Sequence, residues 1–210
     1  MYNKDIFQPS DLTAAHDLIQ AYNFGILIAH TPTGLIASHL PWTLDPAKGQ
    51  YGTLVSHMAR ANPHAEALQS SDEMLVIFSG PHGYISASWY AERDSAPTWN
   101  YTTVHCYGRV RVYDTDPANI QHLGALVEQH EAERPDRWRM HELGRGGMQR
   151  RLPNIVVFEL PITRLEAKFK LGQDERPQDT AQAITALEQH GQHDLATLMH
   201  QYNPPNEPQI

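Results

Sequence analysis

The 210-residue chain contains a single cysteine, Cys106, so it cannot form a disulfide bond within itself. That composition agrees with a reducing compartment. No apolar run approaches the ~20 residues that a helix needs to span a bilayer, and the N-terminus lacks the apolar stretch of a signal peptide. We therefore expect a cytoplasmic protein that makes no membrane contact.

The chain is also poor in positive charge. It has 16 Lys and Arg residues against 24 Asp and Glu residues, which gives a formal net charge of −8. A broad basic surface of the kind that binds DNA by itself is excluded, so DNA binding needs a local patch or a partner. Positive residues are most concentrated in one cluster of arginines: Arg137, Arg139, Arg145, Arg150 and Arg151. This cluster is either a solvated face or a docking site for an anionic partner.

Several motifs that would define a site are missing. The sequence has no GxGxxG fingerprint and no P-loop, which argues against nucleotide binding by those routes. Its 13 histidines include no HExxH and no two-His-plus-Cys cluster. His193, with His190 or His200, could chelate a metal only opportunistically, so we predict no physiological metal site.

The most informative stretch runs from Glu73 to Asp114. Residues 75–78 form a continuous apolar run typical of a buried strand, and residues 101–113 alternate as a strand with one wet face does. Polar and aromatic side chains fill the segment between them. Such residues suit a flat ligand with polar edges, or they plug the end of a barrel.

The rest of the chain predicts an α+β protein built around an antiparallel barrel or sheet. We expect about seven strands, the others covering residues 24–30, 35–44, 51–57, 154–160 and 162–171. In the last of these, Lys168 and Lys170 fall on the outward parity. The expected helices cover residues 11–22, 117–133, 177–189 and 194–202, and the second has an apolar stripe of Ile120, Leu123, Leu126 and Val127. Pro41 cannot donate to a ladder, so a bulge or edge is expected there.

The segment from Ser56 to Leu68 predicts a strand that leads into a helix. Asn62 is suited to cap that helix and Pro63 to occupy its first position. Free amides at a helix start favour an anion, and His57 and Arg60 lie just upstream. The corner is therefore a phosphate seat, or else Arg60 pairs with a carboxylate and Asn62 is only a cap.

Four runs of sequence carry a family resemblance: SHMARANP (56–63), GPHGYISASWY (80–90), PTWNYTTVHCYG (97–108) and PITRLEAKFKLGQ (161–173). In this order they resemble the PaiB family of FMN-binding negative transcriptional regulators. The resemblance implies the FMN-binding split-barrel fold, an antiparallel split β-barrel with peripheral helices, in which two subunits hold FMN at their interface. We expect this domain to cover residues 1–175, with a helical extension at 176–202 and a disordered tail at 203–210.

The resemblance also implies which residues bind the cofactor. His57, Arg60 and Asn62 would contact the flavin phosphate, and Thr98, Trp99 and Asn100 would face the ring and ribityl chain. Lys168, Lys170 and Gln173 would reach the phosphate or the partner subunit. The chain departs from the family pattern at Asp174 and Glu175, where acidic side chains would repel a phosphate.

Two functions follow from the resemblance. The first is an FMN-binding regulator that acts as a homodimer, on DNA directly or through a DNA-binding partner. The alternative is a flavin-dependent oxidoreductase of the split-barrel class acting on a small molecule. In that case His82, His105 and Tyr107 are candidates to line the substrate cavity, because imidazole and phenol groups carry protons. Haem could occupy the same barrel, although no residue marks an axial ligand.

Overall fold

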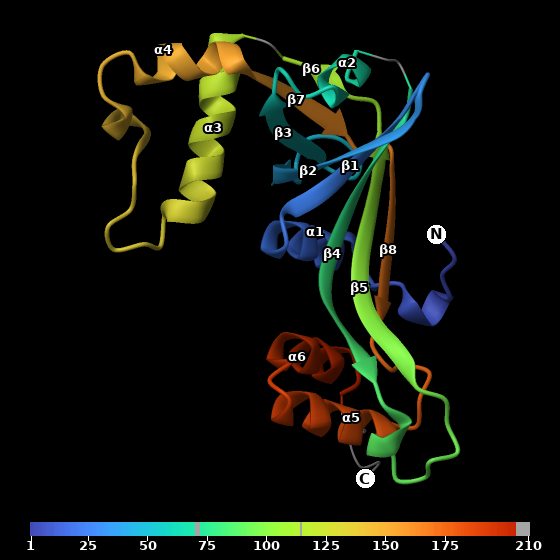
Figure 1. Ribbon diagram of the computed structural model, residues 1–210. Coiled ribbons are helices and arrows are strands. Elements are labelled where there is room, and N and C mark those ends of the chain that lie inside the picture. Colours follow the sequence, from blue (N-terminus) through green and yellow to red (C-terminus); the bar gives the residue numbers. More distant parts are fainter. Residues whose placement is uncertain (70–71, 114, 205–210) are drawn as a thin grey trace. The chain divides into compact units, whose positions relative to one another are not determined.

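The computed structural model describes residues 1–69, 72–113 and 115–204 (Figure 1). Its strands are β1 (Phe24–Thr31), β2 (Gly34–Asp45), β3 (Thr53–Ala59), β4 (Met74–Ile85), β5 (Thr98–Gly108), β6 (Arg111–Val112), β7 (Ile155–Pro161) and β8 (Arg164–Lys170). Its helices are α1 (Leu12–Ala21), α2 (His64–Ala67), α3 (Asp116–Glu131), α4 (Gly147–Arg151), α5 (Pro177–Gln189) and α6 (His193–Tyr202). No helix within the described residues is both long and apolar enough to cross a bilayer.

The strands of the described residues form one eight-stranded sheet in the order β6-β7-β3-β2-β1-β4-β5-β8. The β1–β2, β1–β4, β2–β3, β3–β7 and β6–β7 pairs are antiparallel. A largely antiparallel sheet with separate helices confirms the predicted α+β class. The count of about seven strands was one too low.

Strand β2 changes partner at Pro41. Residues 34–41 pair with β1, whereas residues 42–45 pair with β3. Proline has no N–H to continue a ladder, and its carbonyl instead accepts a hydrogen bond from Ser56 Oγ at 2.7 Å. The structure shows a change of partner at Pro41 in place of the predicted bulge or edge, because β2 is continuous there and lies between β1 and β3.

Three predicted elements have different bounds in the structure. The third strand begins at Thr53, not at residue 51. The single strand expected over residues 101–113 is divided, because β5 ends at Gly108 and the two-residue β6 pairs with β7. The helix expected after Asn62 is only four residues long.

The chain divides into two compact units, which we describe separately. Unit 1 comprises Met1–Ala15, Ser79–Val104 and Glu166–Ile210, and unit 2 comprises His16–Phe78 and His105–Leu165. The predicted division at residue 175 is not tested by this grouping and stays a prediction. Of the predicted disordered tail, residues 205–210 lie outside the described residues.

The core of unit 2 is centred on Trp42, which is fully buried. Its ring packs edge-on against Phe78 at 6.4 Å and against Phe158 at 5.7 Å between centroids. These three residues come from β2, β4 and β7, so the aromatic cluster ties together strands that are distant in sequence. Such edge-to-face contacts are worth about 0.5–1.5 kcal/mol each beyond burial.

In unit 1, helices α5 and α6 pack side by side (Figure 1). Both helices bury apolar faces that contain Ile184, Leu187, Leu195 and Met199. Helix α6 also reaches β5, because Asn100 Nδ2 donates to Met199 Sδ at 3.4 Å. The C-terminal helices therefore buttress the part of β5 that carries predicted cofactor residues.

Substitution of Gly108 by alanine is expected to destabilise the protein by roughly 1–2 kcal/mol. A Cβ at this position would lie 2.3 Å from the carbonyl oxygen of Pro161, and backbone there cannot move without distorting β7. Gly124→Ala is the matched control. Its Cβ would meet nothing nearer than Met140 Sδ at 3.6 Å, and alanine favours the α3 helix by about 0.5–1 kcal/mol. Urea unfolding should show a lower midpoint for Gly108→Ala and a higher one for Gly124→Ala than for the wild type. Equal midpoints for the two variants would contradict the close approach of Pro161 to Gly108.

Candidate functional site

Arg60 follows β3 in unit 2 and is fixed by backbone carbonyls. Its Nε donates to the carbonyl of Pro153 at 3.0 Å and its Nη2 to that of Ile155 at 2.7 Å. Its backbone N–H donates to the Asn154 carbonyl at 2.8 Å. The guanidinium is therefore a surface cation whose position is set by the segment leading into β7.

Asn62 fulfils its predicted capping role. Its Oδ1 accepts from the backbone N–H of His64 at 3.0 Å, and its Nδ2 donates to Ser38 Oγ at 3.3 Å. Helix α2 is too short for its dipole to bind an anion strongly. The three residues predicted to bind the phosphate therefore have different neighbours. Arg60 is hydrogen-bonded to the segment at the start of β7, Asn62 to β2, and His57 to α3.

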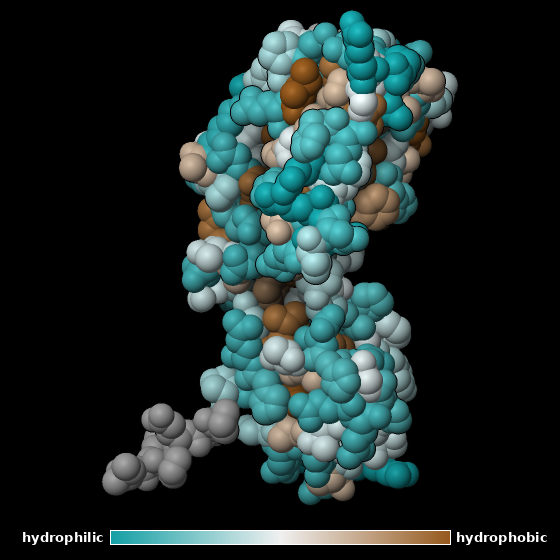
Figure 2. Space-filling model, turned by 90° about the vertical axis from the view of Figure 1, so that its left-hand side faces the viewer, coloured by the Kyte–Doolittle hydropathy of each residue, from teal (hydrophilic) through white to brown (hydrophobic). Residues whose placement is uncertain are grey.

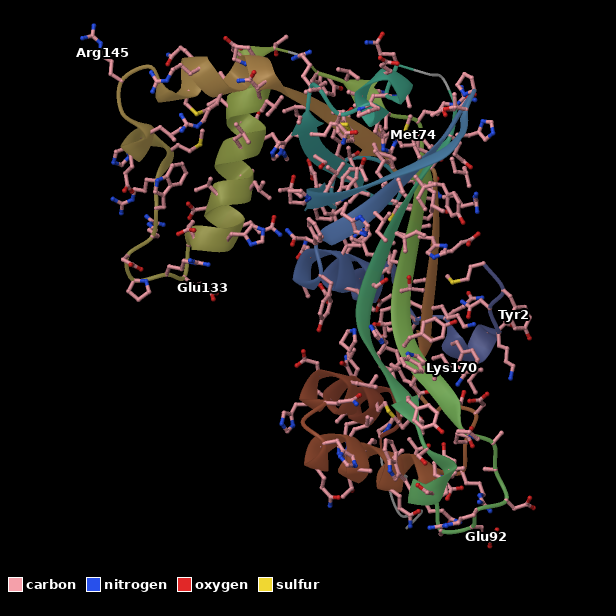
Figure 3. The ribbon with its side chains drawn as sticks, in the orientation of Figure 1. Tyr2, Met74, Glu92, Glu133, Arg145 and Lys170 are labelled. Carbon is pink, nitrogen blue, oxygen red and sulfur yellow. The ribbon has the colours of Figure 1, made fainter. Side chains whose placement is uncertain are left out.

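Unit 1 brings three other predicted residues, Thr98, Trp99 and Asn100, to Lys170 of β8, which is labelled in Figure 3. The ammonium donates to Thr98 Oγ1 at 2.8 Å, to the Trp99 carbonyl at 3.3 Å and to Asn100 Oδ1 at 3.3 Å. An ammonium has three donors, so all three can be engaged here. We call this arrangement the Lys170 cluster. Burial lowers the pKa of Lys170, partly opposed by the carboxylates of Asp174 and Glu175.

An exposed aromatic surface lies beside this cluster. The rings of His82 and Trp99 stack with centroids 5.9 Å apart and an interplanar angle of 27°. Tyr84 meets the same indole edge-on at 6.3 Å. Trp99 is 50% exposed and Tyr84 is 48% exposed. Large aromatic faces in contact with water suit a flat ligand.

Lys168 does not lie on an exposed face as the alternation predicted. It is only 7% exposed, and its Nζ donates to the Tyr2 carbonyl at 3.1 Å. The ammonium also lies 5.4–5.7 Å from the ring centroids of Tyr2, Phe7 and Tyr101. The N-terminal segment covers this lysine, and aromatic rings replace water around its charge.

Gln173 closes the turn after β8. Its Oε1 accepts from the Leu171 N–H at 2.7 Å and its Nε2 donates to the Phe169 carbonyl at 2.6 Å. Nearby, Lys4 Nζ forms an ion pair with Asp174 Oδ2 at 3.3 Å. The predicted contact of Gln173 with phosphate stays a prediction, although both ends of its amide are already engaged.

Replacing Lys170 by methionine is expected to lower stability by about 1–2 kcal/mol, because Asn100 Oδ1 would lose its donor in a site only 2% exposed. Lys4→Met is the control, since its ion pair with Asp174 is exposed and worth little. Chemical unfolding measures both variants. Loss of Trp99 order, read from its fluorescence anisotropy, should accompany Lys170→Met alone, and an unchanged signal would argue against the cluster.

A cavity of about 470 Å³ in unit 2 was not foreseen from the sequence. Helix α3 borders it on one side and β2, β3 and β7 on the other, so we call it the α3 cavity. Glu159 lines it and is only 3% exposed. Its carboxylate pairs with Lys48 and accepts from Tyr113 Oη at 2.7 Å. The sequence feature that indicated this cavity was Glu159, a single carboxylate within the otherwise apolar strand IVVFEL.

The buried face of α3 differs from the predicted apolar stripe. Asn119 and His122 are the buried residues of this helix, whereas Ile120 is 43% exposed. Polar groups in the α3 cavity replace the apolar core that the stripe was expected to meet. Figure 2 views unit 2 from the side of α3 and α4, and its surface there is largely hydrophilic with isolated hydrophobic side chains.

His57 and His122 face one another across the β3–α3 contact. His57 Nδ1 lies 3.0 Å from His122 Nε2, with the rings edge-on. Burial lowers the pKa of His57, and burial together with repulsion from His57 lowers the pKa of His122 to about 4. Both rings are therefore neutral near pH 7 and one donates to the other.

A second cavity, of about 780 Å³, lies between the β1–β2 hairpin and α2. Its lining includes Glu66 and Asp72, and two carboxylates disfavour a phosphate there. Among residues 1–69, 72–113 and 115–204, no three His, Cys, Asp or Glu side chains are grouped as metal ligands.

Comparison with known proteins gives a consistent result. Residues 1–164 match the family described as "Putative FMN-binding domain". The "Protease synthase and sporulation protein PAI 2" of Bacillus subtilis is 29% identical, with 90% of this chain and 89% of that protein aligned. The resemblance predicted from the sequence is thereby confirmed.

Solved structures confirm the predicted split-barrel fold. The FAD and heme binding protein of Mycobacterium smegmatis has a TM-score of 0.61 at 18% identity, covering 83% of this chain and 78% of that one. The flavocytochrome Anf3 of Azotobacter vinelandii also has a TM-score of 0.61, at 15% identity, covering 79% and 70%. At these identities the likeness establishes the fold alone.

Proposed function

Because the chain belongs to the Putative FMN-binding domain family, we propose that it binds FMN and acts, as a homodimer, as a PaiB-like negative regulator of transcription. The family match over residues 1–164 is the observation that carries this proposal. FMN, when bound, supplies a flat redox-active ring and a phosphate anion. The side chains of this chain can be tested against each of those two parts.

The proposed phosphate contact is Arg60, in the corner after β3. Arg60 provides a guanidinium that two carbonyls hold in place, so little side-chain entropy is lost when an anion binds. Asn62 and His57 stay proposed contacts, although Asn62 is bonded to Ser38 and His64 and His57 is bonded to His122. Arg60 is the residue on which the phosphate contact chiefly depends, because it alone of the three carries a permanent charge.

The proposed ring contacts are on the aromatic surface of unit 1. Trp99 and Tyr84 offer exposed faces, and Lys170 donates hydrogen bonds to Thr98, Trp99 and Asn100. We assign Lys170 the role of positioning these residues, since its donors are directed to them. Lys168 and Gln173 are proposed as supports for the same strand and its turn.

The regulatory part of the proposal rests on the likeness to the Bacillus subtilis relative, "Protease synthase and sporulation protein PAI 2", and to the PaiB family. The arginines of α4 are exposed, and each donates to a carbonyl of its own segment, Arg150 to Arg145 and Arg151 to Gly147. These contacts hold two cations at the surface of an otherwise acidic chain, where a DNA phosphate could be reached directly or a DNA-binding partner could dock.

The regulatory proposal is tested by gel-shift binding of the purified protein to DNA upstream of its own gene. Binding should be lost in Arg150→Glu/Arg151→Glu and kept in Lys4→Glu. Light scattering on the same samples tests the homodimer, which should have about twice the 23.8 kDa chain mass. NADH oxidation by FMN-loaded protein that binds no DNA would favour the oxidoreductase alternative.

A further inference from the structure

The α3 cavity presents hydrogen-bond acceptors and apolar side chains. Glu159 lies in its wall and Asp45 at its exposed rim. Val55 and Val157 supply apolar surface from neighbouring strands. A cavity with carboxylates beside aliphatic groups suits a ligand that has a donor-rich head and an apolar stem.

Two buried atoms on the adjoining face of α3 lack hydrogen-bond partners among the described residues. They are Asn119 Oδ1 and His122 Nδ1, from side chains 2% and 5% exposed. An amide oxygen can only accept, and His122 Nδ1 accepts when Nε2 donates to His57. A buried polar atom without a partner costs about 1–3 kcal/mol, so further donors would be stabilising here.

Lys48 shows how a primary ammonium interacts with this wall. It extends from the exposed turn after β2, and its Nζ pairs with Glu159 Oε2 and lies 5.9 Å from the centroid of the Tyr113 ring. The hydrogen bond to Glu159 is the chief cause of the raised pKa of Lys48. The lysine side chain is itself 51% exposed, so it occupies the cavity edge without filling it.

The fixed charges at the cavity balance, so a cationic ligand would have to displace one of the protein's own cations. Asp45 and Glu159 share the wall with Lys48, and His122 is neutral near pH 7 because burial lowers its pKa. Arg111 is 3.8 Å from Glu159 but is itself 66% exposed. The net charge of −8 on the whole chain adds a long-range attraction for cations.

We propose that the α3 cavity binds a small primary alkylammonium ligand, whose head lies between Asp45 and Glu159 and whose alkyl stem rests on Val55 and Val157. Lys48 is then an internal competitor for the same carboxylate. Its lining residue His122 is hydrogen-bonded to His57 of the proposed phosphate contacts, but the residues proposed to hold the ammonium are different ones, and the test does not require flavin.

Three probes of similar shape separate the alternatives: n-butylammonium, n-butanol and butyrate. Calorimetric titration of the full chain should give measurable binding for n-butylammonium and at least about tenfold weaker binding for the other two. Lys48→Met should strengthen n-butylammonium binding at least about threefold, because a competitor is removed. Asp45→Asn should weaken it by a similar factor, whereas Asp94→Asn should not change it.

Asp45→Asn is suited to this test because an asparagine Oδ1 can still accept from the Ala47 N–H, which Asp45 does at 3.1 Å. Circular dichroism verifies that each variant is folded. Weaker n-butylammonium binding in Lys48→Met, or butyrate binding as tightly as n-butylammonium, would overturn the proposal in favour of an anion site. Absence of binding by all three probes would overturn it outright.

Discussion

Arg60→Ala is expected to weaken FMN binding ten- to a hundredfold and to change riboflavin binding by less than about twofold. A hydrogen bond to a charged group contributes about 1.5–3 kcal/mol, and each 1.4 kcal/mol is tenfold in affinity. Riboflavin lacks the phosphate and cannot lose this contact. The difference between the two ligands, measured by calorimetric titration, isolates the phosphate from the ring.

Arg134→Ala is the matched control for charge, because Arg134 is an exposed arginine whose neighbour is Glu131 on the same segment. It should leave both affinities unchanged. Arg60 also secures the carbonyls of Pro153 and Ile155, so the variant could loosen the corner as a whole. Equal losses for FMN and riboflavin would show that its role is structural and would remove it from the phosphate site.

Lowering the pH from 7.5 to 5 is expected to reduce the free energy of unfolding, with about 2 kcal/mol of the loss arising from His122 and a further loss from His57. The folded pKa values are lower than the unfolded value of 6.5, and that of His122 is about 4. The unfolded chain therefore binds more protons in this range. The stabilisation that the two histidines give by being neutral in the folded state is complete above about pH 6.5. It is lost as the pH falls toward about 4.

Urea unfolding at a series of pH values measures this dependence. His122→Gln should flatten it by more than half, because it removes the group with the larger shift and its effect on His57. His141→Gln is the control, since His141 is an exposed residue of the segment Met140–Leu143. A wild-type slope retained in His122→Gln would place the pH sensitivity elsewhere in the chain.

Much of the fold could be predicted from the sequence because its signals are local. The strands expected over residues 24–30 and 35–44 correspond to β1 and β2. Pro41, where a bulge or an edge was expected, is the residue at which β2 changes partner. The length of β5 could not be predicted in this way. It ends at Gly108, where the carbonyl oxygen of Pro161 approaches so closely that only glycine fits, and this is a contact between residues distant in sequence.

The candidate site was predictable only in part. The motif resemblance identified Thr98, Trp99 and Asn100, but the engagement of Lys170 with all three depends on the pairing of β8 with β5. The α3 cavity was missed for the same reason. Lys48 and Glu159 are 111 residues apart in the sequence. The buried face of α3 is polar, with Asn119 and His122, and His122 is hydrogen-bonded to His57 of the distant strand β3.

The central claim is that the chain binds FMN, and gel filtration of the purified protein after incubation with excess FMN tests it most directly. We predict that visible flavin absorption elutes with the protein at about one FMN per chain, and that Arg60→Ala retains much less. Protein that elutes colourless at every FMN concentration, while remaining folded by circular dichroism, would contradict the account.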